Sequence, residues 1–343
     1  MTILIATLML ALAVLSCIGT KLYINYAQQR AILDIPNERS SHSIPTPRGG
    51  GIVFVALFIV FVLICPFFFP RDIPLWFSLS AGGTAVAAAG WMDDRKSLPA
   101  WQRLAIHGGA VLWALYQLGG MPSLSIGFAV LPLVTLGAAG HVFAFIGGVW
   151  MINLYNFMDG IDGLAAGQAV ITALAGAILL LGTPPSFALF ALAASVLGFL
   201  IWNWSPAKVF MGDAGSGFLG FAFFCFALHS EKVGALPLLV WAVLLSPFAV
   251  DATLTLIMRA RQKKHLSEAH RDHLYQQFIK AGWGHGSVAG AILLCSLLLA
   301  TATLLLKPYP LPLFAVTYAA LIMGWKRLYA KADAKLRTTE VTE

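Results

Sequence analysis

The sequence predicts an all-α, polytopic integral membrane protein of about eleven transmembrane helices. Only 11% of its 343 residues are charged and 59% are hydrophobic, whereas soluble globular domains carry about 25% charged residues. The mean hydropathy is +0.81. The apolar runs are continuous and do not alternate, which excludes the sequence pattern of a transmembrane β-barrel. Helices are then the structure that satisfies the backbone hydrogen bonds in lipid.

The apolar runs have about the length that spans a bilayer. They fall near 2–26, 51–70, 74–91, 104–119, 134–154, 164–182, 186–203, 214–230, 236–258, 286–306 and 311–325. The first run is too long for a signal peptide and lacks a cleavage site, so we expect a retained helix. Gly119, Gly120 and Pro122 interrupt the stretch 104–154, and the helix boundaries there can be drawn in more than one way.

The distribution of Lys and Arg predicts the orientation. If the N-terminus is periplasmic, 18 of the 22 Lys and Arg residues fall on the opposite side of the membrane and only three on the N-terminal side. Cytoplasmic loops carry such an excess, so we expect the N-terminus outside and the C-terminus inside. This bias explains the net charge of +7 without a nucleic-acid partner, and a basic inner face suits anionic lipids of the inner membrane.

The chain is predicted to form a single transmembrane domain, 1–325, followed by a basic cytoplasmic tail, 326–343. No internal repeat is visible. The four cysteines lie inside apolar runs without CxxC spacing, and we interpret them as packing residues. The polar groups gather in loops on the cytoplasmic side. These candidate active-site loops lie near 27–50, 92–103, 153–164, 204–214 and 259–285.

Two adjacent carboxylates, Asp93 and Asp94, stand at the end of an apolar run. Neighbouring carboxylates repel one another unless a cation or a proton lies between them. The alternative is a solvated loop end that Arg95 and Lys96 balance. The pair therefore indicates a cation site only in combination with other groups.

The stretch "NLYNFMDGIDGLAAG" at 153–167 places Asn153, Asn156, Asp159 and Asp162 three residues apart. A step of three residues on an α-helix is 300°, so in one regular helix these side chains would spread around half of it. The glycines of the stretch instead predict that a helix ends near 156–159 and that another begins near 163 or 164. Their oxygen atoms could then converge on a hard ion such as Mg²⁺. Ordinary helix capping is the alternative.

The stretch "FMGDAGSGFLG" at 210–220 places Asp213 among glycines just before an apolar run. Small residues there would let a phosphate approach a helix N-terminus, although a simple N-cap is the alternative. The loop "RARQKKHLSEAHRDHLYQQFIKAGWGHG" at 259–286 mixes histidines with Lys and Arg. It suits either a phosphate site or a polybasic segment beside the membrane.

Carboxylates that could hold a divalent ion and cations that could hold phosphates thus occur on one face. Metal-assisted phosphoryl transfer needs both. A transporter of anionic lipids or sugars is the alternative from another class. It would place its charges near the membrane midplane on repeated, broken helices, a pattern that the sequence does not show.

The chain resembles the polyprenyl-phosphate N-acetylhexosamine-1-phosphate transferases, glycosyltransferase family 4. The resemblance lies in the stretches quoted above at 153–167, 210–220 and 259–286, in "PTPRGGG" at 45–51 and in the Asp pair at 93–94. The resemblance covers nearly the whole chain. It implies an enzyme of the bacterial inner membrane with its active site facing the cytoplasm. The reaction implied is transfer of a HexNAc-1-phosphate (GlcNAc, GalNAc or a 6-deoxy HexNAc) from a UDP-sugar to undecaprenyl phosphate, with release of UMP. By analogy, a homodimer is expected.

The resemblance also implies roles for individual residues, Mg²⁺ as the cofactor and Mn²⁺ as its substitute. Asp93 is a candidate base, Asp162 is expected near the uracil, and Phe210 is expected to stack on it. The sequence leaves open whether the reaction takes one step or passes through a covalent intermediate. The implied catalytic residues are Asp93, Asp94, Asp159 and Asp162. The implied metal ligands are Asn156 and Asp213. The implied substrate contacts are Asn153, Phe210, Lys96, Arg103, Arg48, Arg271 and His273, with His270 and Asp251 as further candidates.

One departure from the family pattern bears on which branch of the family the chain resembles. The last loop of the family often carries clustered histidines, HxHH or HHH, whereas this chain has "HRDHLYQQ". His273 matches the first histidine, and Tyr275 and Gln276 stand at later ones. This favours the branch that starts O-antigen or related surface polysaccharides over a phospho-MurNAc-pentapeptide transferase, which stays as the alternative. Three further histidines match no motif and are expected to be structural: His107, His141 and His229.

Overall fold

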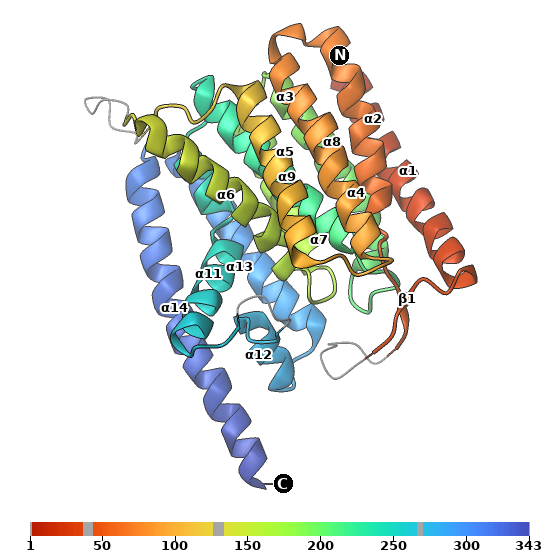
Figure 1. Ribbon diagram of the computed structural model, residues 1–343, viewed down its shortest axis with the longest axis vertical. Helices are drawn as coiled ribbons and strands as arrows, with labels where there is room; N and C mark the ends of the chain where they lie inside the picture. The colour runs from red at the N-terminus through yellow and green to blue at the C-terminus, as the bar shows by residue number, and fades with distance from the viewer. Residues whose placement is uncertain (1, 37–43, 126–133, 266–269, 343) are drawn as a thin grey trace.

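The protein is a bundle of α-helices (Figure 1). Its structure, a computed structural model, describes residues 2–36, 44–125, 134–265 and 270–342, with side chains from 3 to 336. The loops predicted near 27–50 and 259–285 therefore fall partly outside the described residues. The helices are α1 Thr2–Gln29, α2 Ile52–Phe68, α3 Ile73–Phe77, α4 Gly83–Asp93, α5 Ala100–Leu118, α6 Gly137–Phe157, α7 Leu164–Leu179, α8 Pro184–Asn203, α9 Asp213–Lys232, α10 Leu238–Leu244, α11 Ser246–Arg261, α12 Leu274–Lys280, α13 His285–Leu306 and α14 Pro310–Thr342.

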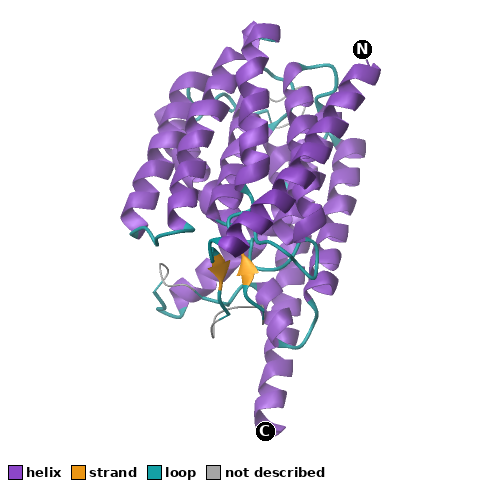
Figure 2. Ribbon diagram, turned by 90° about the vertical axis from the view of Figure 1, so that its right-hand side faces the viewer, coloured by secondary structure: helices purple, strands orange, loops and turns teal. Residues whose placement is uncertain are grey.

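The all-α prediction is confirmed, with one small exception. Two-residue strands, β1 (Leu33–Asp34) and β2 (Thr46–Pro47), pair antiparallel. A short 3₁₀ turn, η1 (Pro70–Asp72), precedes α3, and a π turn, η2 (Ser78–Gly82), joins α3 to α4. Figure 2 shows the strands and many of the loops at the end of the bundle towards which α14 extends.

The protein is a multi-pass membrane protein. Each of the eleven predicted apolar runs coincides with a helix or with a broken helix. Among the described residues, five spans pass a test of length and apolar composition, and a bent helix pair would make a sixth. The total of eleven crossings and the orientation of the termini therefore stay predictions.

Two predicted boundaries differ from the structure. The run 236–258, expected to be one helix, is broken into α10 and α11, which meet at an angle of 78°. Pro247 lies in the first turn of α11, where its ring and its missing N–H prevent the helix from continuing. The helix predicted to end near 325 continues as α14 to Thr342. Residues 326–342 contain no Gly or Pro and are rich in good helix formers.

Helix α9 forms the centre of the bundle. Every residue of α9 from Ala214 to Glu231 is buried, and α9 packs mainly against α4 and α6. The crossing of α4 over the start of α9 depends on Gly90, because a Cβ atom there would lie 2.3 Å from the backbone nitrogen of Ala214. This close approach brings the end of α4, with its two aspartates, next to the first turn of α9.

Replacing Gly90 by alanine is expected to destabilise the bundle by about 1–3 kcal/mol, because the added methyl group overlaps backbone atoms that cannot rotate away. The measurement is the midpoint of thermal unfolding in detergent. Gly109→Ala is the matched control, since nothing lies within 4 Å of a Cβ atom at that helical glycine. Equal midpoints for the two variants would contradict the close α4–α9 crossing.

Candidate active site

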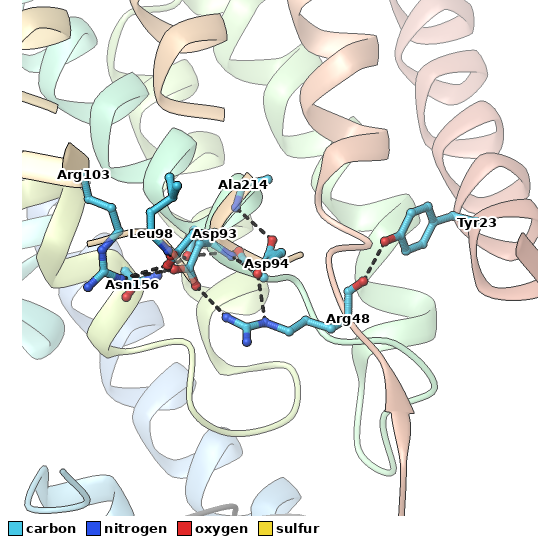
Figure 3. A network of polar contacts seen from close by, with 11 residues as sticks. Tyr23, Arg48, Asp93, Asp94, Leu98, Arg103, Asn156 and Ala214 are labelled. Carbon is cyan, nitrogen blue, oxygen red and sulfur yellow. Dashed lines mark hydrogen bonds and ion pairs between the residues drawn. The ribbon is translucent and has the colours of Figure 1, made fainter. Parts of the chain in front are cut away.

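Polar side chains from distant parts of the sequence meet at one end of the bundle. At this end, called here the polar end, α4, α6 and α8 finish and α5 and α9 begin. Figure 3 shows carboxylates at the end of α4, two arginines and an asparagine around the first turn of α9. The structure thus brings together Arg48, Asp93, Asp94, Arg103, Asn156 and Asp213.

Asp94 caps the N-terminus of α9. Its carboxylate oxygens accept hydrogen bonds from the backbone N–H groups of Asp213 at 3.0 Å and Ala214 at 3.4 Å. A carboxylate in this place satisfies donors that the helix leaves free and favours its dipole. The Asp94 side chain is 2% exposed, and the Nε atom of Arg48 lies 2.8 Å from its Oδ1 atom. Asp94 therefore fixes the end of α4 to the start of α9.

Asp213 lies between two arginines. Its Oδ1 atom is 3.1 Å from Nη2 of Arg48, and its Oδ2 atom is 3.8 Å from Nη1 of Arg103. The same Arg103 nitrogen lies 2.9 Å from Oδ2 of Asp93, whose Oδ1 atom accepts the backbone N–H of Leu98 at 2.5 Å. The two guanidinium groups thus hold the carboxylates of both helix ends in place.

The turn between α6 and α7 confirms the break predicted from the sequence. Helix α6 ends at Phe157 and α7 begins at Leu164. Gly163 has a φ of 72°, and a Cβ atom there would lie 2.7 Å from the Trp204 ring. At the end of α6, the amide of Asn156 donates to Ser216 at 3.2 Å and also hydrogen-bonds to the Asp213 carboxylate.

The cluster carries more negative charge than its arginines balance. Burial raises the pKa of Asp94, and Arg48 offsets only part of this effect. Burial also raises the pKa of Asp159 well above its usual range, and the nearby Asp213 and Asp94 raise it further. Burial and the neighbouring carboxylates of Asp94 and Asp93 raise the pKa of Asp213 to about 7. A cation would relieve the same repulsion.

The residues present fit a Mg²⁺ ion whose remaining ligands are water molecules and substrate phosphates. Within the described ranges, no three His, Cys, Asp or Glu side chains form a ready-made metal site. Asp213 and Asn156 nevertheless offer adjacent oxygen donors at the end of α6 and the start of α9. Mg²⁺ in phosphoryl-transfer sites typically takes one or two carboxylates and completes its shell with water and substrate phosphates. The donor set therefore matches the expected cofactor chemistry.

A polar cavity of about 440 Å³ opens beside the cluster. Its polar lining comes from α5, α6, α9 and the segment around the start of α12. The lining side chains that can hydrogen-bond are Arg103, His107, Asn153, Asn156, Asp213, His270, His273 and Gln276. Burial and the neighbouring His273 lower the pKa of His270 to about 4. The cavity thus combines the expected metal ligands with neutral and basic groups.

Asp162 lies apart from this cavity. Its Oδ1 atom is 3.1 Å from Nδ1 of His285, and its Oδ2 atom accepts the backbone N–H of Ala207 at 3.1 Å. Burial acts to raise the pKa of Asp162, but the hydrogen bond and charge of His285 outweigh burial and lower it. The turn therefore directs Asp159 towards Asp213 and Asp162 towards His285, so the two aspartates do not converge.

Besides Arg48, three expected substrate contacts do not line the cavity. Phe210 is half-buried, and its backbone N–H donates to the carbonyl of Pro47 at 2.8 Å. Lys96 is exposed just after the end of α4. The carbonyl of Arg271 accepts a hydrogen bond from the Gln277 amide at 2.7 Å. Their predicted roles as substrate contacts stay predictions.

Asp251, a further candidate for a substrate contact, is a buried carboxylate that joins three helices. Its carboxylate accepts the backbone N–H groups of Leu274 at 2.8 Å and Tyr275 at 3.4 Å, and the indole N–H of Trp325 at 3.0 Å. It thereby holds the start of α12 against α11 and α14. Its Oδ1 atom is 4.0 Å from Nδ1 of His273, so it supports the cavity wall without lining it.

Three residues at the site were not predicted. His107, expected to be structural, and Gln276, noted only as a departure from a histidine pattern, both line the cavity. A signal for His107 was available, because it follows Arg103 by four residues and therefore shares its helix face. His285, the partner of Asp162, had no such signal, since the two are distant in sequence.

The chain is similar to known membrane transferases. Residues 76–231 match the protein family described as "Glycosyl transferase family 4". A decaprenyl-phosphate N-acetylglucosaminephosphotransferase of Mycobacterium leprae is 30% identical over 322 residues, covering 81% of this chain and 78% of the relative. A probable undecaprenyl-phosphate N-acetylglucosaminyl 1-phosphate transferase of Bacillus subtilis is 26% identical over 284 residues, covering 80% and 77%. A phospho-N-acetylmuramoyl-pentapeptide-transferase of Microcystis aeruginosa is 30% identical over 275 residues, covering 74% of each chain.

Proposed function

Because the chain belongs to glycosyl transferase family 4, the polyprenyl-phosphate N-acetylhexosamine-1-phosphate transferases, we propose that it transfers a HexNAc-1-phosphate from a UDP-sugar to undecaprenyl phosphate. The products are undecaprenyl-diphosphate-sugar and UMP. The observation that carries the proposal is the position of Asp213 between Arg48 and Arg103, beside Asp93 and Asn156. This arrangement offers oxygen ligands for a cation and guanidinium groups for phosphates at one point.

In the proposed reaction, an oxygen of the lipid phosphate attacks the β-phosphorus of the UDP-sugar. A P–O bond forms to the lipid phosphate, and the bond between the β-phosphorus and the bridging oxygen breaks, so that UMP leaves with that bond's electrons. The second pKa of a phosphate is about 6, so the attacking oxygen is largely ionised at neutral pH. A base such as Asp93 would then assist the reaction without being essential to it.

The residues of the chain mainly orient the reacting groups. Arg48 and Arg103 carry donors that suit phosphate oxygens in two-point contacts, and Asp93 and Asp94 hold these arginines in position. Asp213 and Asn156 would hold Mg²⁺, which when bound neutralises diphosphate charge. His273 and Gln276 line the cavity beside these groups.

Two branches of the family remain distinct candidates for the donor. Tyr275 and Gln276 in place of the later histidines favour an amino sugar for O-antigen or a related surface polysaccharide. Similarity to the Microcystis aeruginosa relative supports the second candidate, transfer of phospho-MurNAc-pentapeptide. We further propose that the polar end faces the cytoplasm in the inner membrane, because it carries most of the Lys and Arg.

The test is a panel of labelled nucleotide sugars incubated with membranes that contain the protein and undecaprenyl phosphate. We expect a butanol-extractable labelled lipid and stoichiometric UMP with one of UDP-GlcNAc, UDP-GalNAc or a UDP-6-deoxy-HexNAc. Product from UDP-MurNAc-pentapeptide alone would select the second candidate. Failure to form any labelled lipid would contradict both candidate reactions and would favour the transporter alternative.

Removing divalent cations is expected to lower the rate of this reaction by at least about 100-fold, because the buried carboxylates then repel the incoming diphosphate. The measurement is UMP release after treatment with EDTA and after readdition of a cation. Mg²⁺ is expected to restore the full rate and Mn²⁺ part of it, while Ca²⁺, which prefers more ligands at longer distances, restores little. Undiminished turnover in EDTA would refute the cofactor assignment.

A further inference from the structure

His107 is a cavity residue for which the described residues supply no hydrogen-bond partner. It lies on α5 and lines the polar cavity. Its Nδ1 atom is buried and has no hydrogen-bond partner, and its Nε2 atom makes no hydrogen bond within the described part of the chain. A histidine that lines a polar cavity and makes no hydrogen bond among the described residues can bond to a ligand in that cavity.

The ring has a proton to donate from Nε2. A protonated imidazole carries a proton on both nitrogens, and a neutral one carries a proton on one of them. In the neutral ring the proton avoids Nδ1, because a buried N–H without an acceptor is among the rarest arrangements in proteins. In either state, therefore, Nε2 presents an N–H group that no acceptor among the described residues uses.

The depth of His107 in the bundle indicates which substrate it meets. It lies seven residues after Ala100, the first residue of α5, or about 10 Å along the helix axis from the polar end. Gly217, one turn after Asp213 on α9, and Ile152, one turn before Asn156 on α6, also line the cavity on the inner side of the carboxylate cluster. His107 thus belongs to the inner floor of the cavity, beyond Arg103.

The outer surface beside this floor is apolar. Leu104 lines the cavity and is also 56% exposed, and Trp101, one turn nearer the polar end, is 68% exposed. The cavity wall formed by α5 therefore also borders the lipid-facing surface of the bundle. This position favours a head group that arrives from the membrane over a water-soluble nucleotide.

Resting on the proposed function, we propose that His107 donates a hydrogen bond from Nε2 to a phosphate oxygen of the polyprenyl phosphate acceptor. The bond would hold the acceptor phosphate on the inner side of Arg103, from where an oxygen can reach the diphosphate held at Asp213. His107 would then be a substrate-binding residue for the acceptor. The diphosphate of the nucleotide sugar has the same chemistry, so the test must separate the two sources of phosphate.

The first test is steady-state kinetics with each substrate varied in turn. His107→Leu is expected to raise KM for undecaprenyl phosphate by about 10-fold, since a hydrogen bond to a charged group contributes about that factor, while KM for the UDP-sugar changes less than about twofold. His107→Gln, whose amide N–H lies close to the position of Nε2, is expected to restore most of the loss. His141→Leu is the control, because His141 bonds to the backbone of Met121 at the opposite end of the bundle.

The second test does not depend on turnover. In nanodiscs, undecaprenyl phosphate is expected to raise the thermal unfolding midpoint of the wild-type protein more than that of His107→Leu. Undecaprenol, which lacks the phosphate, should not distinguish them. Three results would overturn the proposal: equal lipid affinity of the two proteins, a rise in KM for the UDP-sugar alone, or a glutamine variant as impaired as the leucine variant. If the wild-type protein forms no product but this binding difference is present, only the proposed reaction fails.

Discussion

Replacing Asp213 by alanine is expected to lower the rate of UMP release by about 1,000-fold or more, the effect typical of removing a group that stabilises transition-state charge. Asp213 lies at the centre of the cluster, within hydrogen-bonding or ion-pairing distance of Asn156, Asp93 and two arginines. It is also the carboxylate best placed to hold the expected cation. Its loss would remove the charge around which the other groups are arranged.

Two further variants separate this loss of rate from a folding defect. Asp213→Asn keeps the shape of the side chain and should retain the thermal unfolding midpoint while losing most of the rate. Asp333→Ala, which removes an aspartate from α14 outside the cluster, should be as active as the wild type. Turnover of Asp213→Ala near that of the wild type would show that the metal assignment is incorrect.

Replacing Arg48 by lysine is expected to lower kcat by about 100-fold, although the charge is kept. The Arg48 guanidinium bridges Asp94 at 2.8 Å and Asp213 at 3.1 Å with two different nitrogens. A lysine has a single ammonium group and cannot reproduce this two-point contact. The variant would leave Asp94 or Asp213 without its partner and misplace the first turn of α9 against α4.

The control for Arg48→Lys is Arg95→Lys. Arg95 is exposed, and its guanidinium lies over the Trp91 ring at 3.9 Å, an interaction that a lysine can also make. We expect wild-type kcat for this control. Similar kcat values for the two lysine variants would indicate that Arg48 contributes charge alone and that the bridging geometry is unimportant.

Local features of the site could be predicted from the sequence. Glycines around Asp159 and Asp162 predicted the break between α6 and α7, because a step of three polar residues does not form one helix face. The structure confirms this break at Phe157 and Leu164. The same rule could not say where each aspartate points. Asp159 turns towards Asp213, whereas Asp162 meets His285, and only the packing of α13 against the turn decides this.

Long-range features could not be predicted in the same way. The contact of Asp94 with the first turn of α9 requires the crossing at Gly90, and nothing in either segment alone specifies that crossing. The capping of α12 by Asp251 joins helices whose order in space the sequence does not give. His107 was dismissed because it matched no motif, although its spacing from Arg103 places both on one face of α5.

The most direct test of the central claim follows the β-phosphorus of the donor. Purified protein would be given undecaprenyl phosphate and a UDP-sugar labelled separately in the sugar and in the β-phosphate. Transfer at Asp213 of a sugar phosphate predicts that both labels enter the lipid in equal molar amounts while UMP accumulates. Entry of the sugar label alone, with release of UDP, would contradict this account of the site.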